Sequence, residues 1–529
     1  MFLTRINKSI AKVTMKPGRI IGSVLHFFII SFITSPIIYT VGALVTFGYA
    51  ILSGLNIHSE QAISAFIQSP AGTKTLMQGV TLPGTISFLV SILATVQAAS
   101  SYEIKSDMGS SRFADNDELR PILQKTSNPQ GLIFGSTSSG LLVKSPNTSG
   151  HVMTIGGSGE GKTYTHVIPS LLSWPGSALV VDIKGELYET TAKYRQTLGE
   201  VIRFNPTENN SVKYNPIFFC DTVHAAQDLA RTLIPEPVRG EPFWAQSAQA
   251  ILAAAAFEGS KSLLSLGEVA ERCILTPIQD LIKELSESHY RETKLLAGGY
   301  LDTPDKTLGG IASTLRTSLT TLASDMDIVN STSQSTFKPS SLEDTTTIYL
   351  TIPESRIEQL KPLWTIIISQ FIRFFENRQE GNPLPILFML DEFPRMGRIT
   401  GIDGALSTLR SRNVHIDIIL QSLSQLDDKY GKDVRKVIMD LCPFKLVLSA
   451  SEPETQKVLS DLAGKKTGVS RSVSTMSIHQ HFSSVSVPLI YPEEFARLKD
   501  EAILFAPKQM PIKLKRIDWK KDKVLSKRA

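Results

Sequence analysis

The stretch HVMTIGGSGEGKTYTHVIPSLL (residues 151–172) determines the fold class that this sequence predicts. An apolar run typical of a strand leads into a glycine-rich loop, and a run typical of a helix follows it. The loop fits the pattern G-x-x-x-x-G-K-[ST], which between a strand and a helix predicts a phosphate-binding site. Its residues are Gly156, Gly157, Ser158, Gly159, Glu160, Gly161, Lys162 and Thr163.

The residue types in this loop suit a nucleoside triphosphate. Glycines let the backbone wrap around phosphates without Cβ clashes, so that N–H groups and the helix N-terminus face the anion. Lys162 can reach the terminal phosphates, and the Thr163 hydroxyl can bind Mg²⁺. We therefore expect ATP and Mg²⁺ as ligands, in preference to a glycine-rich turn without a ligand.

An acidic pair follows another predicted strand, which we expect to adjoin the strand of the phosphate loop. In PILFMLDEF (residues 385–393), five apolar residues precede Asp391 and Glu392. Such a continuous apolar run is typical of a strand buried on both faces. We expect Asp391 to hold Mg²⁺ and Glu392 to polarise the attacking water. A strand end whose acids only face solvent is the weaker alternative, because no turn residue separates the acids from the apolar run.

Further apolar runs complete a sheet. Helix-like segments separate most of them, and this alternation predicts an α/β fold with a mostly parallel, doubly wound sheet that binds its ligand at the carboxyl ends of the strands. The predicted strands are residues 151–155, 178–186, 200–206, 347–354, 385–393, 414–422 and 444–449.

Two polar residues at strand ends have open roles. Gln421 ends one predicted strand and either senses the terminal phosphate or is an ordinary polar residue. Asp182 ends another, close to Lys184 and Glu186. It either braces the phosphate loop or caps the next helix.

The segment GIDGALSTLRSRN (residues 401–413) predicts a helix with two arginines beside its apolar face. Phosphoryl transfer accelerates by about 10³–10⁵ when a neighbouring subunit supplies an arginine. We expect Arg410 to be that arginine, with Arg412 as the second choice and two solvated arginines as the alternative. The apolar face consists of Ile402, Ala405, Leu406 and Leu409.

Charge is distributed unevenly along the chain. The net charge is +5, but residues 1–19 hold five basic residues and no acidic one, and residues 513–528 hold eight basic residues against two acidic ones. The body between the two ends is therefore mildly acidic. This distribution argues against a nucleic-acid surface that extends over the whole protein.

The three cysteines lie far apart, at Cys220, Cys273 and Cys442. They form neither a CxxC motif nor a metal-ligand spacing, so a disulfide framework is not expected and a reducing compartment fits. We expect three buried thiols.

Two uncharged stretches predict a membrane anchor. Residues 20–55 and 82–99 contain no Lys, Arg, Asp or Glu, and about 20 apolar residues span a bilayer. We expect transmembrane helices at about 25–47 and 82–99. Because basic residues precede the first, the N-terminus (1–19) and everything after about residue 100 should be cytosolic, with loop 56–80 outside. The alternative for 82–99 is a soluble core helix.

Strand-like runs stop between about residues 218 and 335, where helical spacing predicts an all-α segment. We expect Trp244 to lie in its core and the Gly309–Gly310 pair to mark a loop. Two other segments are less regular. Residues 465–490 are rich in serine and predict a flexible excursion or an edge hairpin. The basic end of the chain predicts a solvated tail that could also touch lipid or nucleic acid.

In these segments the chain resembles the coupling proteins of type IV secretion systems, the TraG/TraD kind of membrane-anchored ATPase. The resemblance extends over residues 150–462 and rests on several segments in order. They are HVMTIGGSGEGKT, VIPSLLSWPGSALVVDIKGELYETTAKYR, VIRFNP, YNPI, LDEFPRMGRI and ALSTLRSRNVHIDIILQSLSQLDDKYG.

This resemblance implies a RecA-like nucleotide domain (101–217 and 336–529) with an inserted all-α domain (218–335). It also implies a hexameric ring at the bacterial inner membrane that passes DNA–relaxase complexes or protein effectors to a secretion channel. The family's phosphate and Mg²⁺ ligands, acidic pair and sensor correspond to Lys162 and Thr163, Asp391 and Glu392, and Gln421. Glu160 departs from the pattern, since it places an acid beside the phosphates.

Two rival functions stay open at this point. A chromosome DNA translocase of the FtsK kind shares the phosphate loop, but usually has more membrane spans and a basic winged-helix end. A membrane receptor that uses ATP only to order a docking platform is the second. The Asp391–Glu392 pair favours hydrolysis over that receptor.

Overall fold

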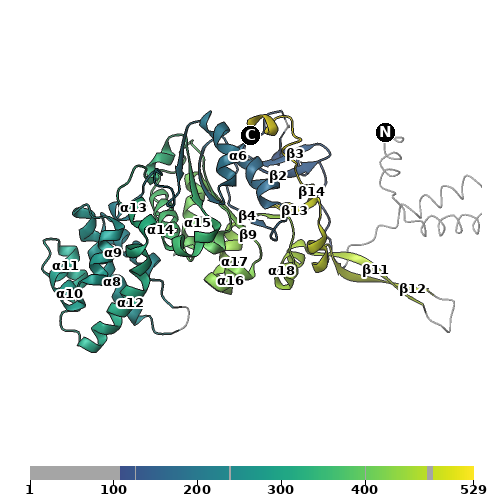
Figure 1. Ribbon diagram of the computed structural model, residues 1–529. Helices are drawn as coiled ribbons and strands as arrows, with labels where there is room; N and C mark the ends of the chain where they lie inside the picture. The colour runs from purple at the N-terminus through teal and green to yellow at the C-terminus, as the bar shows by residue number, and fades with distance from the viewer. Residues whose placement is uncertain (1–107, 125–126, 238–239, 400, 474–479) are drawn as a thin grey trace, which may run out of the picture. The chain divides into compact units, whose positions relative to one another are not determined.

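The computed structural model describes residues 108–124, 127–237, 240–399, 401–473 and 480–529 (Figure 1). The predicted basic N-terminus, both apolar stretches and the loop between them lie outside these residues. Residues 108–529 form one compact unit. Within the described part of the chain, no helix combines the length and apolarity that a bilayer crossing requires.

The centre of the unit is a block of parallel strands in the order β10-β4-β9-β8-β5-β7-β6. Every residue of β4, β7, β8, β9 and β10 is buried, as their continuous apolar runs predict. The predicted α/β fold with a mostly parallel sheet is confirmed. The strands are β4 (Val152–Ile155), β5 (Ser177–Ile183), β6 (Glu200–Phe204), β7 (Thr346–Ile352), β8 (Ile386–Leu390), β9 (Val414–Leu420) and β10 (Phe444–Val447).

Helices cover both faces of this sheet. Successive residues of β5 alternate between two hydrophobic cores, with Ala178 and Val180 in one and Leu179 and Val181 in the other. The first core includes α5 (Ile168–Leu171) and α6 (Glu186–Gln196). The second core includes α14 (Ile357–Phe375), α15 (Ile402–Leu409), α16 (Ser424–Tyr430), α17 (Lys432–Leu441) and α18 (Pro453–Ala463).

An antiparallel extension beyond β10 was not predicted. The sheet continues through β13 (Glu501–Phe505), β14 (Ile512–Lys515), β2 (Leu132–Thr137), β3 (Gly140–Lys144) and β1 (Leu123–Gln124). The chain before the phosphate loop and the C-terminal end therefore lie side by side, as Figure 1 shows.

Most basic side chains at the C-terminal end are exposed, as expected of a solvated tail, but the segment also packs against the fold, which was not expected. In β14, Ile512 and Leu514 are buried while Lys513 and Lys515 are exposed, so the basic residues are the outer half of a strand alternation. Further along, Leu525 is fully buried and is the first residue of the short helix α19 (Leu525–Arg528). A charge count alone conceals this alternation.

The described residues between β6 and β7 form helices without a strand (Figure 1). Ala248, Ile251, Leu252 and Ala255 are buried at helical spacing between Phe243 and Lys261. All three cysteines of the chain are buried and free, as expected. The predicted limits of the nucleotide domain and the inserted domain stay a prediction. The helices are α7 (Val223–Leu233), α8 (Phe243–Lys261), α9 (Leu266–Leu275), α10 (Ile278–Ser286), α11 (Arg291–Gly298), α12 (Asp305–Ser324) and α13 (Met326–Ser331).

Two expectations for this helical segment are wrong. Trp244 is 40% exposed and does not lie in the core. Gly309 and Gly310 lie inside α12 and mark no loop. The two errors share a cause, because a Cβ on Gly310 would come within 2.4 Å of the Trp244 ring. The absence of a side chain at Gly310 thus leaves room for the indole beside α12.

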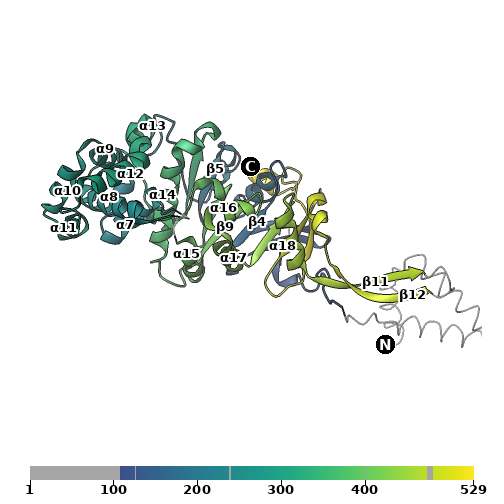
Figure 2. The same ribbon diagram turned by 90° about the horizontal axis from the view of Figure 1, so that it is seen from below.

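Residues 465–488 adopt the hairpin alternative. Strands β11 (Lys465–Val473) and β12 (Gln480–Pro488) form a separate antiparallel sheet that projects from the unit (Figures 1 and 2). At its base, Lys466 pairs with Ser110 in a β-bridge. The connecting residues 474–479 lie outside the described part of the chain.

Candidate functional site

The phosphate loop lies between β4 and a helix that begins with a π-helical turn, η2 (Thr163–Val167). Backbone contacts pin its first two residues to neighbouring strands. The Gly156 N–H donates to the carbonyl of Leu420 at 3.1 Å, and the Gly157 N–H donates to the hydroxyl of Ser449 at 2.9 Å. The loop is therefore anchored at the carboxyl ends of β9 and β10, where a parallel sheet binds ligands.

Lys162 lies in the interior of the loop, with 6% of its surface exposed. Its ammonium group donates to the carbonyls of Gly156 at 2.8 Å and Gly157 at 3.1 Å. The same nitrogen lies 3.6 Å from a carboxylate oxygen of Glu392. The loop lysine and the acid that sequence reasoning assigned to water activation therefore share one site.

The strand that carries the acidic pair is not the immediate neighbour of the phosphate-loop strand. We expected β8, which carries Asp391 and Glu392 at its end, to adjoin the phosphate-loop strand β4, but β9 lies between them. Glu392 nevertheless lies beside Lys162. Its backbone has a left-handed conformation (φ 51°), and its N–H donates to the Asp391 carboxylate at 3.1 Å. A non-glycine residue in this conformation is uncommon and is concentrated at functional sites.

The buried Asp391 carboxyl has a pKa raised to about 7. Burial is the main cause and the charge of Glu392 adds to it, while Lys162 acts in the opposite direction. A divalent cation would favour the ionised form. Asp391 and the Thr163 hydroxyl offer the hard oxygen ligands that Mg²⁺ prefers, so the residues present fit this ion.

Gln421, directly after β9, belongs to the site. Its side-chain amide donates to both carboxylate oxygens of Glu392, at 3.1 and 3.0 Å. Its backbone N–H donates to the side chain of Gln425 at 3.1 Å. The contact to Glu392 makes Gln421 more than a polar residue at a strand end, and its role as a sensor stays a prediction.

Asp182 caps a helix, which was the second of the two roles considered for it. Its carboxylate accepts hydrogen bonds from the N–H groups of Leu187 at 3.1 Å and Tyr188 at 2.8 Å, in the first turn of α6. Lys184 instead pairs with Glu354 at 3.3 Å. No contact of Asp182 with the phosphate loop is observed among the described residues.

Arg410 and Arg412 lie away from the phosphate loop of their own chain. Both belong to η7 (Arg410–Arg412), which precedes β9, whereas Lys162, Glu392 and Gln421 all follow strands of the same parallel block. A seven-residue strand is roughly 23 Å long. Arg410 is exposed, and its Nε lies 3.4 Å from the Ser149 hydroxyl. It could therefore serve a phosphate site only on another subunit.

Sequence reasoning missed Arg516, which follows β14. One of its terminal nitrogens donates to the carbonyl of Glu160 at 2.8 Å and lies 3.6 Å from the Glu160 carboxylate. The acid that looked unfavourable in the loop is thus paired. The two residues are 356 positions apart, and no local pattern signals their contact.

A second unpredicted contact is buried beneath the loop. His166, in the helix after the loop, and Asp417, in the middle of β9, are both fully buried, and their Nε2 and Oδ2 atoms are 2.6 Å apart. The Thr154 hydroxyl of β4 donates to the other carboxylate oxygen at 3.0 Å. The helix that follows the phosphate loop is therefore tied to β9, the strand that Gln421 directly follows.

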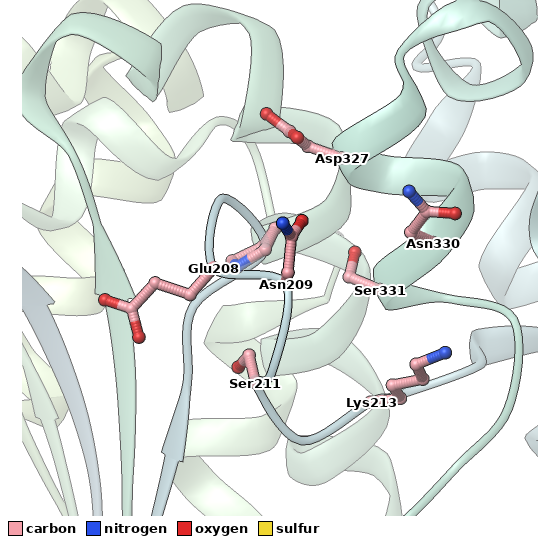
Figure 3. A pocket seen from close by; sticks show the side chains of 8 residues that line it. Glu208, Asn209, Ser211, Lys213, Asp327, Asn330 and Ser331 are labelled. Atoms are coloured by element: carbon pink, nitrogen blue, oxygen red, sulfur yellow. The ribbon is translucent and has the colours of Figure 1, made fainter.

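A polar cavity lies elsewhere, where the loop after β6 meets α13 (Figure 3). Strands β7, β5, β8 and β9 separate β6 from the phosphate-loop strand, so this cavity of about 250 Å³ is distinct from the phosphate site. Its lining consists of Pro206, Glu208, Asn209, Ser211, Lys213, Asp327, Asn330 and Ser331.

Residues 102–529 match the protein family described as type IV secretory system conjugative DNA transfer. The chain belongs to this family. The resemblance to type IV coupling proteins found in the sequence is thereby confirmed.

Two relatives with long matched segments agree with this family. The chain is 27% identical over 446 residues to protein VirD4 of Rhizobium radiobacter, covering 79% of this chain and 65% of VirD4. It is 24% identical over 456 residues to conjugal transfer protein TraG of Escherichia coli, covering 74% and 71%. The chain thus spans less than two thirds of the length of this VirD4 relative.

Solved structures of plasmid coupling protein TrwB share the fold. The complex of TrwB with the non-hydrolysable ATP analogue ADPNP has a TM-score of 0.62 at 18% identity, covering 78% of this chain and 94% of TrwB. The complex with ADP and Mg²⁺ has a TM-score of 0.60 at 18% identity, covering 78% and 94%. At this identity the likeness establishes the mixed α/β architecture of this family member.

Proposed function

We propose that this chain is a Mg²⁺-dependent ATPase that couples substrates to a type IV secretion channel. The observation that carries the proposal is the meeting of Lys162, Glu392 and Gln421 at one edge of the sheet, with the Lys162–Glu392 distance at 3.6 Å. A phosphate-binding lysine, a carboxylate base and a residue that orients the base are the parts that nucleotide hydrolysis needs.

Each residue has a separate part in this mechanism. The loop N–H groups and Lys162 bind the phosphates and offset negative charge that develops on them. Glu392, oriented by Gln421, accepts a proton from the attacking water. Thr163 and Asp391 would hold Mg²⁺, which supplies charge neutralisation at the phosphates when it is bound.

An arginine from a neighbouring copy completes the proposed site. Arg410 is exposed at the edge of the sheet opposite the phosphate loop, so it cannot serve its own site. In a closed ring, the sheet edge formed by the amino ends of the strands in one subunit can face the edge formed by the carboxyl ends of the strands in the next. Such a contact is heterologous. A homo-oligomeric ring, which the resemblance puts at six copies, would satisfy this requirement.

Cargo and location also belong to the proposal. The matched family is described by conjugative DNA transfer, and TraG is named a conjugal transfer protein. We place the chain at the bacterial inner membrane, multi-pass, anchored by residues 20–100, with the ATPase region cytosolic. There it would hand DNA–relaxase complexes or protein effectors to the channel.

A chain of ion pairs offers a route from the site to the helical segment. Arg395, three residues after Glu392, lies 3.8 Å from Glu354. In the same short helix η5 (Glu354–Arg356), Arg356 contacts Asp325 at 2.6 Å and Asp327 at 2.8 Å. These contacts connect the segment after the acidic pair to α13, and Asp327 also lines the polar cavity (Figure 3).

Two substitutions in the full-length protein test the proposal. We expect Lys162→Ala to abolish ATP binding, and Glu392→Gln to leave binding intact while it stops hydrolysis and transfer. Lys436→Ala is a control, because Lys436 is an exposed lysine of α17 that pairs with Asp433 in its own helix. Binding of a fluorescent ATP analogue, phosphate release and transfer in cells are the measurements.

The outcomes separate the rival functions. Normal hydrolysis by Glu392→Gln would refute the assigned base. Transfer that survives both substitutions would favour a receptor that does not use ATP turnover. Duplex DNA movement without a secretion channel would favour a translocase of the FtsK kind.

A further inference from the structure

Arg516 connects the C-terminal end of the chain to the phosphate loop through three backbone carbonyls. Its guanidinium donates to Glu160 at 2.8 Å, to Leu448 just after β10 at 2.5 Å, and to Glu501 in β13 at 3.0 Å. Its own N–H donates to the carbonyl of Asp500 at 2.8 Å. One side chain thus binds the loop, a parallel strand end and the antiparallel extension together.

The position of this guanidinium is well defined. Only 12% of the Arg516 side chain is exposed, and a planar guanidinium loses little freedom per hydrogen bond that it forms. Hydrogen bonds from a charged donor are also stronger than neutral ones. The contact can therefore fix where the Glu160 peptide lies, and with it the curvature of the loop around a phosphate.

Arg516 also offsets a charge in the loop. The Glu160 carboxylate, 42% exposed, lies 3.6 Å from the guanidinium. Without that partner, the carboxylate would repel a triphosphate bound by the same loop. The cation therefore acts on the loop by position and by charge.

The residues that follow Arg516 contact the helix after the loop. Tyr164, next to Thr163, donates its hydroxyl to the Asp518 carboxylate at 2.5 Å, and its ring centroid lies 5.7 Å from that of Trp519. Trp519 is 8% exposed. Two successive parts of the phosphate-binding element thus rest on residues 516–519.

We propose that Arg516 is a positioning residue of the nucleotide site, which holds the phosphate loop in its binding shape and neutralises Glu160. The C-terminal segment after β14 is then a part of the ATP site. This inference rests on the proposed function for its ligand, a nucleoside triphosphate. Because binding is measured apart from hydrolysis, the two ideas can fail separately.

The test compares substitutions in the full-length protein by titration with a fluorescent ATP analogue and by steady-state kinetics. Arg516→Met should weaken nucleotide binding by roughly tenfold to a hundredfold, the range for loss of a charged hydrogen bond. It should raise KM for ATP more than it lowers kcat, because the hydrogen bonds of the Arg516 guanidinium go to backbone carbonyls and not to Glu392. Arg516→Lys keeps the charge without the planar fork and should fall between.

A second substitution separates positioning from simple structural support. Glu160→Gln combined with Arg516→Met should recover part of the lost affinity, because the unpaired acid is then absent. Lys513→Met is the matched control. Lys513 is a half-exposed cation on the solvent-facing side of β14 and pairs with the Glu501 carboxylate at 2.8 Å. It should leave affinity unchanged.

Three results would overturn the inference. The first is an affinity of Arg516→Met for the ATP analogue within twofold of the wild type. The second is an equal loss of affinity in Lys513→Met. The third is a double variant, Arg516→Met with Glu160→Gln, that recovers no affinity although Arg516→Met has a normal melting temperature. If Arg516→Met unfolds, the affinity of Arg516→Lys is the deciding measurement. Wild-type affinity in Arg516→Lys would contradict the claim that the planar guanidinium holds the loop in its binding shape. A wild-type chain that binds ATP analogue without hydrolysis would refute the proposed ATPase and leave this inference testable.

Discussion

The side-chain amide of Gln421 donates to both carboxylate oxygens of Glu392, at 3.1 and 3.0 Å. An amide has two N–H donors and one carbonyl acceptor, so this forked contact leaves the Gln421 carbonyl free for a further partner. The strand that carries Gln421 also lies between the strand of the phosphate loop and the strand of the acidic pair. β9 therefore joins both halves of the candidate site.

This contact predicts a specific loss in Gln421→Leu. Without the amide, Glu392 loses its orientation while the phosphate loop is unaffected, so kcat should fall by about 10²-fold with little change in ATP affinity. Phosphate release and analogue binding measure the two effects. Gln456→Leu is a control, because Gln456, on α18, donates to the carbonyl of Ala450, which precedes this helix. An affinity loss as large as the kcat loss would contradict an orienting role.

The exposed Arg410 predicts complementation between subunits. Arg410→Ala and Glu392→Gln should each be inactive in hydrolysis, with a loss of about 10³-fold or more expected for an arginine supplied in trans. A mixture of the two variants should regain activity, because some interfaces then combine an intact Arg410 with an intact Glu392. Phosphate release from mixed oligomers is the measurement.

Arg412→Ala serves as the comparison for that experiment. The side chain of Arg412 contacts the carbonyl of Arg378 within its own chain, so its removal should have the smaller effect on hydrolysis. A larger loss of hydrolysis in Arg412→Ala than in Arg410→Ala would contradict the role of Arg410 as the arginine supplied by a neighbouring subunit. Mixtures that regain no activity would contradict it as well.

The buried pair of His166 and Asp417 predicts a non-additive effect on stability. Removal of one partner leaves the other buried, so His166→Leu should cost about 3–5 kcal/mol, whereas replacement of both by apolar residues recovers most of that. A thermal melt should show a drop of roughly 3–6 °C for the single variant and a smaller drop for His166→Leu/Asp417→Leu. Additive losses would mean that the two side chains stabilise the fold independently.

Lys144 predicts a pH dependence of stability. It is fully buried, its ammonium lies 3.0 Å from His415 Nδ1, and burial lowers its pKa to about 7 despite the opposing charge of Asp417. The unfolded chain holds the Lys144 proton up to about pH 10, whereas the folded protein releases it near pH 7. The free energy of unfolding therefore rises with pH between about 7 and 10, because burial of Lys144 costs least when the lysine is neutral in both the folded and the unfolded chain.

Lys144→Met should accordingly stabilise the protein most below pH 7, by up to about 4 kcal/mol, and progressively less towards pH 10. The measurement is the difference in melting temperature between variant and wild type across this range. Lys513→Met, on the surface, should show no such trend. A difference that is constant with pH would mean that Lys144 stays charged in the folded protein.

Local pattern was sufficient for the parts of the site that are continuous in sequence. The phosphate loop, the acidic pair and the apolar runs of the strands could be predicted, because each feature is set by neighbouring residues and the period of their side chains. Gln421 could be found only as a candidate, since a strand end is visible in the sequence and its neighbour is not. Trp244 was misplaced because helical spacing does not reveal that Gly310 accepts its ring from outside.

The sequence by itself thus determined the phosphate-binding element, the acids and the class of the sheet. Only the tertiary structure decided that β9 separates the two motif-bearing strands, that Arg516 pairs with Glu160 across 356 positions, and that His166 meets Asp417 across 251. The physical reason is that strand order and long-range side-chain pairs depend on how whole elements pack. Hydrophobic periodicity states which face of an element is buried, but not which element covers it.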